Sequence, residues 1–254
     1  MTPAWKRLVP PQAYGVSAYH LKGANLAHNL QTFDMPHAEQ VSFAGLLTAT
    51  GGFLDAFTFV GHGHVFANSM TGNVVLLGLA AGTGDFTSVW WHLVPILAFI
   101  VGVAAAHVIR LKLADGPVGR VEQISLWLEI GFLSLVALLP HEIPDEAIIV
   151  GIAFVAAVQS TSFTRVRGGG YNSTMTTGNL RRFAEMLFKG LVPKRDSQAL
   201  WQARTFAVIC LCFLGGAMIG GFTTPRLGNS AVAVPTLALL FLQLQLWMAL
   251  RPAR

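Results

Sequence analysis

Asn68-Ser69-Met70-Thr71-Gly72-Asn73 is a polar stretch in a chain that is otherwise strongly apolar, and a version of it occurs twice. The second copy, Ser173-Thr174-Met175-Thr176-Thr177-Gly178-Asn179, repeats the Thr-Gly-Asn triplet 106 residues later. Each copy follows a glycine-rich segment, at 61–64 and 168–170, and each of those segments follows a long apolar run. The duplication predicts two repeats that place the same motif at corresponding points of the fold.

The composition around the two motifs indicates a multi-pass membrane protein. Of the 254 residues, 53% are hydrophobic and 11% are charged, and the mean hydropathy is +0.56. An average soluble domain has about 25% charged residues. The net charge of +5 is better explained by the cationic bias of cytoplasmic membrane loops than by a nucleic-acid partner. We therefore expect the lipid bilayer, and no nucleic acid, as a partner.

Six segments are long and apolar enough to cross a bilayer, which takes roughly 17–25 residues. They are about 42–60, 90–109, 123–140, 147–164, 204–222 and 231–250. The predicted fold is an all-α polytopic membrane bundle over 41–252, preceded by a polar cytoplasmic extension at 1–40. Residues 1–40 contain no apolar run of the kind found in a cleavable signal peptide.

The distribution of Lys and Arg predicts the orientation of these spans. With both termini cytoplasmic, the inner regions are 1–41, 110–122, 165–204 and 251–254, and they hold sixteen of the seventeen cations. If the two Thr-Gly-Asn segments also spanned, this asymmetry would be lost. We therefore expect both motif segments to be short or re-entrant helices after spans one and four.

Three spans in each repeat place the second repeat upside down relative to the first. The predicted repeats cover about 41–140 and 147–250, and inverted repeats of this kind are common in transporters. Small residues four positions apart support the correspondence, because they let helices approach closely. These are Ala98, Gly102 and Ala106 in span two, and Cys212, Gly216 and Gly220 in span five.

The motif residues are the candidate substrate-binding residues. In the first copy, Ser69 or Thr71 is expected to cap a helix running from about Val74 to Ala81, with free amides at its start. Such a helix end would suit an anion or the carboxylate of a zwitterion. The alternative is that the motif serves tight helix packing alone. The candidates are Asn68, Ser69, Thr71, Gly72, Asn73, Thr176, Thr177, Gly178 and Asn179.

The second copy is followed by Arg181 and Arg182 in an amphipathic segment that does not suit a lipid interior. These two arginines are candidates for contact with an anion or with lipid. The alternative is that they are cations that only set the topology against anionic lipid.

Ionisable residues inside or beside spans are candidates for ion or proton coupling, because burying them in a membrane is costly. Asp55 lies in span one and His62 follows it, while Glu129 lies in span three. A structural pairing of Asp55 with a histidine or a motif hydroxyl is the alternative, as is a pairing of Glu129 with His107 or Arg110. We expect no metal site, no cofactor and no enzymatic activity, since no known catalytic or metal-ligand spacing occurs.

The segment Gly51-Gly52-Phe53-Leu54-Asp55-Ala56-Phe57-Thr58, followed by 65–73, resembles the YoaK-like bacterial membrane proteins. The resemblance covers roughly 40–250 and implies a multi-pass protein of the bacterial inner membrane. The repeat pattern leads us to expect a transporter or channel for an unidentified small solute, and the short chain leads us to expect a homodimer. A membrane scaffold or sensor that uses 1–40 to bind partners is the alternative.

Overall fold

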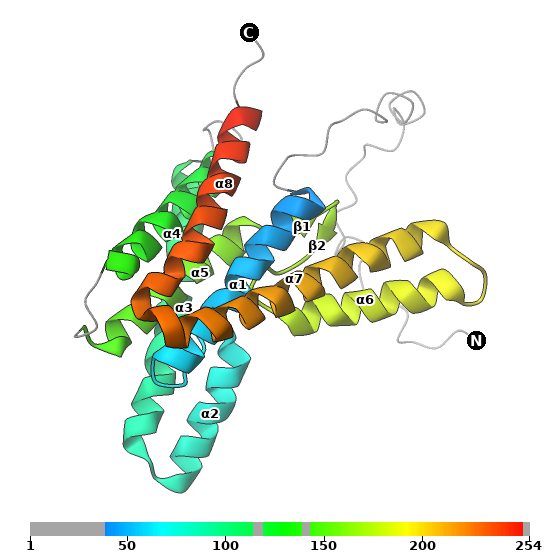
Figure 1. Ribbon diagram of the computed structural model, residues 1–254. Helices are drawn as coiled ribbons and strands as arrows, with labels where there is room; N and C mark the ends of the chain where they lie inside the picture. Colours follow the sequence, from blue (N-terminus) through cyan, green and yellow to red (C-terminus); the bar gives the residue numbers. More distant parts are fainter. Residues whose placement is uncertain (1–38, 114–118, 139–142, 251–254) are drawn as a thin grey trace, which may run out of the picture. The chain divides into compact units, whose positions relative to one another are not determined.

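The computed structural model describes residues 39–113, 119–138 and 143–250, most of one compact unit that begins at Pro36 (Figure 1). The predicted extension therefore lies almost entirely outside the described residues, as do the last four residues of the chain. In order, the elements are α1 (Val41–Gly61), α2 (Met70–Thr83), α3 (Phe86–Lys112), α4 (Arg120–Leu138), α5 (Asp145–Ser162), β1 (Arg165–Val166), β2 (Gly169–Gly170), α6 (Thr176–Leu191), α7 (Ser197–Leu227), a 3-10 helix (Gly228–Val232) and α8 (Ala233–Ala249).

The predicted all-α polytopic bundle is confirmed, because every predicted span corresponds to a helix: α1, α3, α4, α5, α7 or α8. Within the described parts of the chain, five stretches are long and apolar enough to cross a membrane, and α7 and α8 form a single one through the 3-10 helix between them. Helix α7 begins at Ser197, earlier than the predicted 204. The Asp196 carboxylate explains the early start, since it accepts the N–H groups of Gln198 and Ala199 and so caps the helix.

Helix α1 packs chiefly against α7, and small residues allow the close contact (Figure 1). A Cβ added at Gly216 would collide with the backbone oxygen of Ala49, and one at Gly52 would collide with that of Phe213. The contact between α3 and α5 is built in a similar way, because a Cβ at Gly102 would lie 2.5 Å from the oxygen of Phe154. The small-residue spacing in the sequence therefore marks real sites of close helix approach.

The same pairing of elements occurs in the two halves of the chain. Helix α1, the first helix of the first half, packs on α7, the long helix of the second half. In the same way α5, the first helix of the second half, packs on α3, the long helix of the first half. The short helices α2 and α6 pack on the helices that follow them, α3 and α7. The last helices of the halves, α4 and α8, pack on each other, and Leu126, Leu239 and Phe57 belong to the apolar core shared by α1, α4 and α8.

The two motif helices begin earlier than the sequence predicts. Helix α2 starts at Met70 rather than at about Val74, and α6 starts at Thr176, so both Thr-Gly-Asn triplets lie inside a first helical turn. Ser69 is the N-cap residue of α2, but its side chain does not cap the helix. The predicted capping by Ser69 is therefore wrong, and its hydroxyl has a different partner.

Candidate functional site

The asparagine that ends each Thr-Gly-Asn triplet ties its helix to the loop before it. Asn73 accepts the Phe66 N–H at 3.1 Å through Oδ1 and donates to the Phe66 carbonyl at 2.6 Å through Nδ2. Asn179 makes the same two bonds with the backbone of Asn172, at 3.3 and 2.7 Å. In both copies the partner lies seven residues earlier, and both asparagine side chains are buried. The duplicated asparagine therefore has a clear structural role in both loops.

The carboxylate of Asp55 organises the first loop. Its Oδ1 accepts the backbone N–H groups of Asn68 at 2.8 Å and Ser69 at 3.2 Å, and its Oδ2 accepts the Ser69 hydroxyl at 2.5 Å. Only 4% of Asp55 is exposed. Of the two pairings considered from the sequence, a histidine or a motif hydroxyl, the structure contains the hydroxyl. The backbone amides of Asn68 and Ser69, which directly precede α2, are therefore bound to Asp55.

Gln159 occupies the position in the second half that Asp55 holds in the first. The Ser173 hydroxyl donates to Gln159 Oε1 at 2.8 Å, and the two residues are fourteen positions apart, as Asp55 and Ser69 are. A constant offset of 106 residues would instead pair Asp55 with Thr161. The second copy has two extra residues between its serine and its Thr-Gly-Asn triplet, so the contact shifts to Gln159.

The two motif loops meet on Gly51 in the middle of α1. Asn68 of the first loop donates from Nδ2 to the Gly51 carbonyl at 2.9 Å. On the other loop, the Ser173 carbonyl oxygen would lie only 2.6 Å from a Cβ built on Gly51. Only glycine leaves room for this approach. Asn68 of the first motif and Ser173 of the second are thus brought to the same residue, although they are more than a hundred positions apart in the chain.

Several buried polar atoms near these loops have no hydrogen-bond partner among the described residues. They include Asn68 Oδ1, Thr176 Oγ1 and both carboxylate oxygens of Glu129. Glu129 is fully buried on α4, and the Gln159 side chain lies beside it without reaching hydrogen-bond geometry. The alternative pairing of Glu129 with Arg110 is not found, because the Arg110 guanidinium donates to the Thr161 carbonyl at 2.8 Å.

The remaining motif candidates lie at the edge of this cluster. Thr71, Thr177 and Gly178 are exposed on the first turns of their helices. Gly72 faces the Phe66 ring, which would lie 2.8 Å from a Cβ at that position. The structure therefore divides the motif into buried residues that shape the loops and exposed residues at the helix surface.

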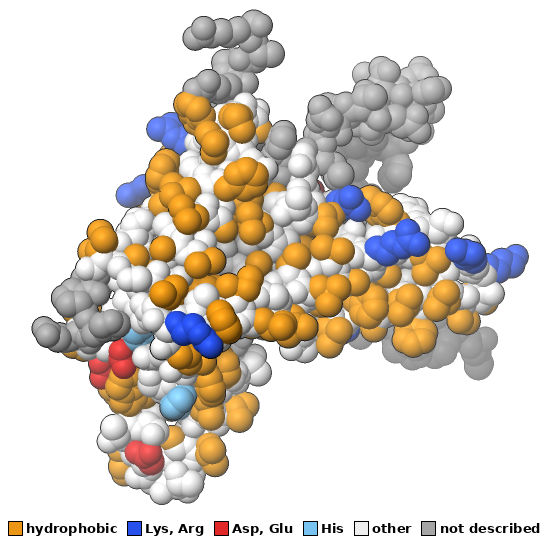
Figure 2. All heavy atoms as spheres, in the orientation of Figure 1, with side chains coloured by type: hydrophobic (Ala, Val, Ile, Leu, Met, Phe, Trp, Pro, Cys, Tyr) orange, Lys and Arg blue, Asp and Glu red, His pale blue; other side chains and the backbone are white. Residues whose placement is uncertain are grey.

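The arginines after the second motif lie on exposed positions of α6. Arg181 is 3.7 Å from Glu185, and Arg182 lies above the Phe206 ring of α7 at 5.9 Å. Lys and Arg side chains gather toward the connection between α6 and α7 in Figure 2, where Lys194 and Arg195 are exposed. This cationic surface is a part of the molecule separate from the cluster at Gly51.

His62 is held by the second half of the chain. Its Nδ1 is 2.6 Å from Asp145 Oδ1 at the start of α5, and its ring packs against Phe57 with the centroids 4.6 Å apart. Sequence reasoning placed His62 near Asp55 and did not identify Asp145 as its partner. Among the described residues, no group of three or more His, Cys, Asp or Glu side chains is placed to hold a metal ion.

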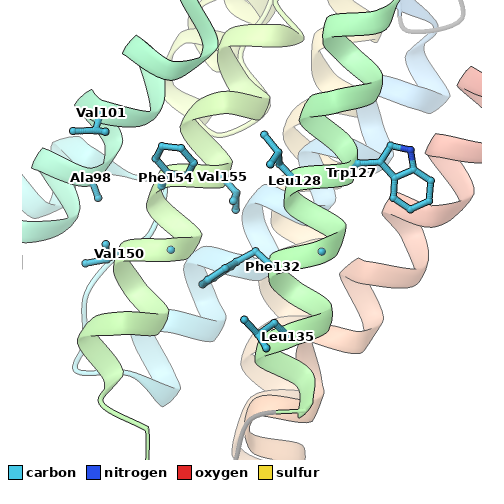
Figure 3. A pocket seen from close by; sticks show the side chains of 11 residues that line it. Ala98, Val101, Trp127, Leu128, Phe132, Leu135, Val150, Phe154 and Val155 are labelled. Atoms are coloured by element: carbon cyan, nitrogen blue, oxygen red, sulfur yellow. The ribbon is translucent and has the colours of Figure 1, made fainter. Parts of the chain in front are cut away.

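An apolar groove of about 710 Å³ lies between α3, α4 and α5 (Figure 3). Its lining includes Ala98, Phe132 and Phe154, and no charged or amide side chain contributes to it. A smaller groove of about 90 Å³ lies between the corresponding helices α7, α8 and α1. These surfaces suit hydrocarbon rather than a polar solute, so we do not place the candidate site there.

Comparison with known proteins gives a family and one relative. The family described as "Protein of unknown function (DUF1275)" matches residues 43–244. A Bacillus subtilis protein described as "UPF0700 transmembrane protein YoaK" is 29% identical over 196 residues, which is 75% of this chain and 86% of that protein. No solved structure matches the chain.

Proposed function

The chain belongs to the DUF1275 family, whose member YoaK is described as a transmembrane protein, and from that premise we propose that it is a proton-coupled transporter or channel for a small solute. The solute pathway runs past Gly51, where the two motif loops meet. Glu129 is the proton-binding group, and Asp55 holds the first loop in place. The protein sits in the bacterial inner membrane with both termini in the cytoplasm.

The meeting of the two buried polar loops on one glycine carries this proposal. Polar and ionisable groups inside a membrane bundle are costly, and in transporters they mark the path of the solute or the proton. If the motif residues served only to pack the helices, we would expect their buried polar atoms to be hydrogen-bonded, as those of Asn73 and Asn179 are. Asn68 and Glu129 instead have buried acceptor atoms without a partner among the described residues. Buried acceptors of this kind are unfavourable unless a ligand or water completes them.

Repeats of opposite orientation support transport as well. The equivalent asparagine bonds in the two loops and the exchange of packing partners between the halves agree with two three-helix repeats related by an axis in the membrane plane. In such proteins, discontinuous or short helices meet near the bilayer midplane and form the solute site. Helices α2 and α6 are the short helices of this chain, at 14 and 16 residues.

The chemistry of the cluster favours a proton or a hydrogen-bond-donating solute over an anion. The amides of Asn68 and Ser69 at the start of the first motif already bind the Asp55 carboxylate, so they are not available to an anion. The atoms left without a partner at Asn68 and Glu129 are acceptors. Acceptors are completed by a proton, an ammonium group or a hydroxyl group.

Reconstitution into vesicles tests the proposal. Purified protein is assayed for uptake of a panel of amines, amides and polyols, with and without an inward proton gradient. For a solute that moves, Glu129→Gln should abolish the effect of the gradient, because Gln cannot bind and release a proton at neutral pH. Glu122→Gln, on the same helix, is the matched control and should keep the gradient effect.

Thermal stability in detergent separates this loss from misfolding. Glu129 has no hydrogen-bond partner to lose among the described residues, so Glu129→Gln should melt at or above the temperature of the parent protein. Gradient-driven uptake that is the same in Glu129→Gln and in the parent would refute the assignment of Glu129. The absence of flux for the whole panel would refute the transport proposal.

A further inference from the structure

The two halves of the chain are linked at the end of α1 by the contact between His62 and Asp145. His62 follows α1 of the first half, and Asp145 begins α5 of the second half. The side chains are 2.6 Å apart, and His62 is buried while Asp145 is 41% exposed. We name this pair the α1-end contact.

A second link joins the halves at the opposite end of α1. Glu39, just before α1, accepts the Gly168 N–H through Oε2 at 3.0 Å, and its carbonyl accepts the Arg167 N–H at 2.9 Å. Arg167 and Gly168 lie in the β1–β2 turn that follows α5. We name this pair, Glu39 with Gly168, the α1-start contact.

The two contacts occupy similar positions in the two halves. In each, an acidic side chain at or just before the start of the first helix of one half meets the loop after the first helix of the other half. The local backbone is also similar, because each of these loops contains two consecutive residues with positive φ: Gly63 and His64, and Arg167 and Gly168.

The contacts lie on either side of the polar cluster. Helix α1 has 21 residues and is therefore about 30 Å long at 1.5 Å per residue, close to the thickness of the hydrocarbon core. One contact lies before the helix and the other after it, and Gly51 and Asp55 lie between them. Helix α1 packs mainly on α7 rather than on α5, so the two contacts join the ends of helices that are otherwise weakly coupled.

We propose that the α1-end contact and the α1-start contact are the two gates of the pathway, one at each membrane face. The proposal rests on the transport function proposed above. With both contacts formed, the polar cluster is closed to both sides, and breaking one contact opens the cluster to the face where that contact lies. A pair of similarly placed contacts, one at each end of α1, would let the protein open at one face while it stays closed at the other.

The gates differ in chemistry although they are similar in position. The α1-end contact is between two side chains, and one of them is the imidazole of His62. In the α1-start contact the Glu39 carboxylate accepts the Gly168 N–H, and the Glu39 backbone carbonyl beside it accepts the Arg167 N–H. Removing the Asp145 carboxylate therefore breaks the first gate completely. At the second gate, a glutamine at position 39 would keep an acceptor for Gly168, whereas an alanine would not.

Thiol labelling of a buried probe tests the gates without any solute. In a background carrying Cys210→Ser and Cys212→Ala, Ser160→Cys places a thiol beside Gln159, where the natural serine is 7% exposed and bonds only within its own helix. A membrane-impermeant maleimide is added to right-side-out or inside-out vesicles, and the rate of labelling is measured from each face. Asp145→Ala opens the first gate, and Glu39→Ala opens the second.

Each opening variant should raise the labelling rate at least about tenfold from one face only, which corresponds to a shift of about 1.4 kcal/mol in the opening equilibrium. Asp145→Ala should act from the face that holds His62, and Glu39→Ala from the opposite face. The matched controls are Glu146→Ala, which removes the neighbouring acid, and Glu39→Gln, which keeps the acceptor. Both controls should label at the parent rate.

The proposal is overturned if Asp145→Ala and Glu39→Ala raise labelling from the same face, or if neither variant changes the rate while its melting temperature stays at the parent value. Vesicle uptake provides an independent readout. If the two variants raise labelling from opposite faces but no solute of the panel is transported, the gate proposal stands and the transport function is rejected. If the protein transports a solute but neither variant changes the labelling rate, the transport proposal stands and the gate proposal is rejected.

Discussion

Replacing Asn73 or Asn179 with alanine tests whether the repeated motif is primarily a structural device. Each asparagine forms two hydrogen bonds with the backbone of the residue seven positions earlier. Alanine fills neither bond, so it leaves one backbone N–H and one backbone C=O in the loop without the partner they have in the parent. The two variants should therefore destabilise the protein to a similar extent.

The expected magnitude follows from those two bonds. Leaving a buried donor or acceptor unsatisfied costs about 1–3 kcal/mol per group, so each variant should lose at least about 2 kcal/mol. For a chain of this size, 1 kcal/mol changes the melting temperature by about 2–4 °C, so we expect a decrease of at least about 4 °C. Asn73→Asp should be no more stable than Asn73→Ala, because it places a carboxylate oxygen where Nδ2 is 2.6 Å from the Phe66 carbonyl.

The assay is thermal unfolding of the detergent-purified protein, followed by the loss of its monodisperse peak in size-exclusion chromatography. Thr71→Ala and Thr177→Ala are the matched controls, because both threonines are exposed within the same triplets. They should stay within about 0.5 kcal/mol of the parent. The reasoning is refuted if the asparagine variants melt with these controls, or if only one of the two is destabilised.

Two further variants test other contacts. Asp55→Asn keeps an oxygen that can accept the Asn68 and Ser69 N–H groups, so it should melt within a few degrees of the parent. Asp55→Ala should lose at least about 2 kcal/mol of unfolding free energy. Equal melting temperatures for the two variants would mean that the carboxylate does not hold the loop. Gly216→Ala forces a Cβ into the Ala49 carbonyl and should destabilise the protein by about 1–3 kcal/mol. Its control, Gly215→Ala, has nothing within 4 Å of the added Cβ and should be neutral or slightly stabilising. The same unfolding assay measures both, and a Gly216→Ala protein as stable as Gly215→Ala would contradict the close packing of α1 on α7.

The spans could be predicted from the sequence because each depends on local composition. An uninterrupted apolar run of sufficient length has no stable place except a membrane or a large core, and each of the six predicted spans corresponds to a helix among the described residues. Helix ends were less accurate, because they depend on a few capping groups. The Asp196 cap moved the start of α7, and the Asp55 carboxylate took the Ser69 hydroxyl away from its expected capping role.

The contacts between the two halves could not be predicted from local composition, because they join residues that are far apart in the chain. His62 was placed near Asp55 because the two are close in the chain, whereas its partner Asp145 is 83 positions away. The 106-residue offset of the triplets is no reliable guide to such contacts, because residues before the second motif are shifted by two positions, as the pairing of Asp55 with Gln159 shows.

The different surroundings of the two buried carboxyls decide which one can act on a solute. Asp55 accepts three hydrogen bonds from the loop that it holds, so a change in its charge would release the loop rather than move a proton alone. In the second half, the neutral amide of Gln159 accepts the Ser173 hydroxyl. A hydrogen bond to the motif serine therefore does not need a charged acceptor. Glu129 has no such structural bonds among the described residues, and it lies beside the Gln159 amide. A group that makes no structural hydrogen bond can gain and lose a proton while the loops stay in place, and for this reason we propose Glu129, rather than Asp55, as the coupling group.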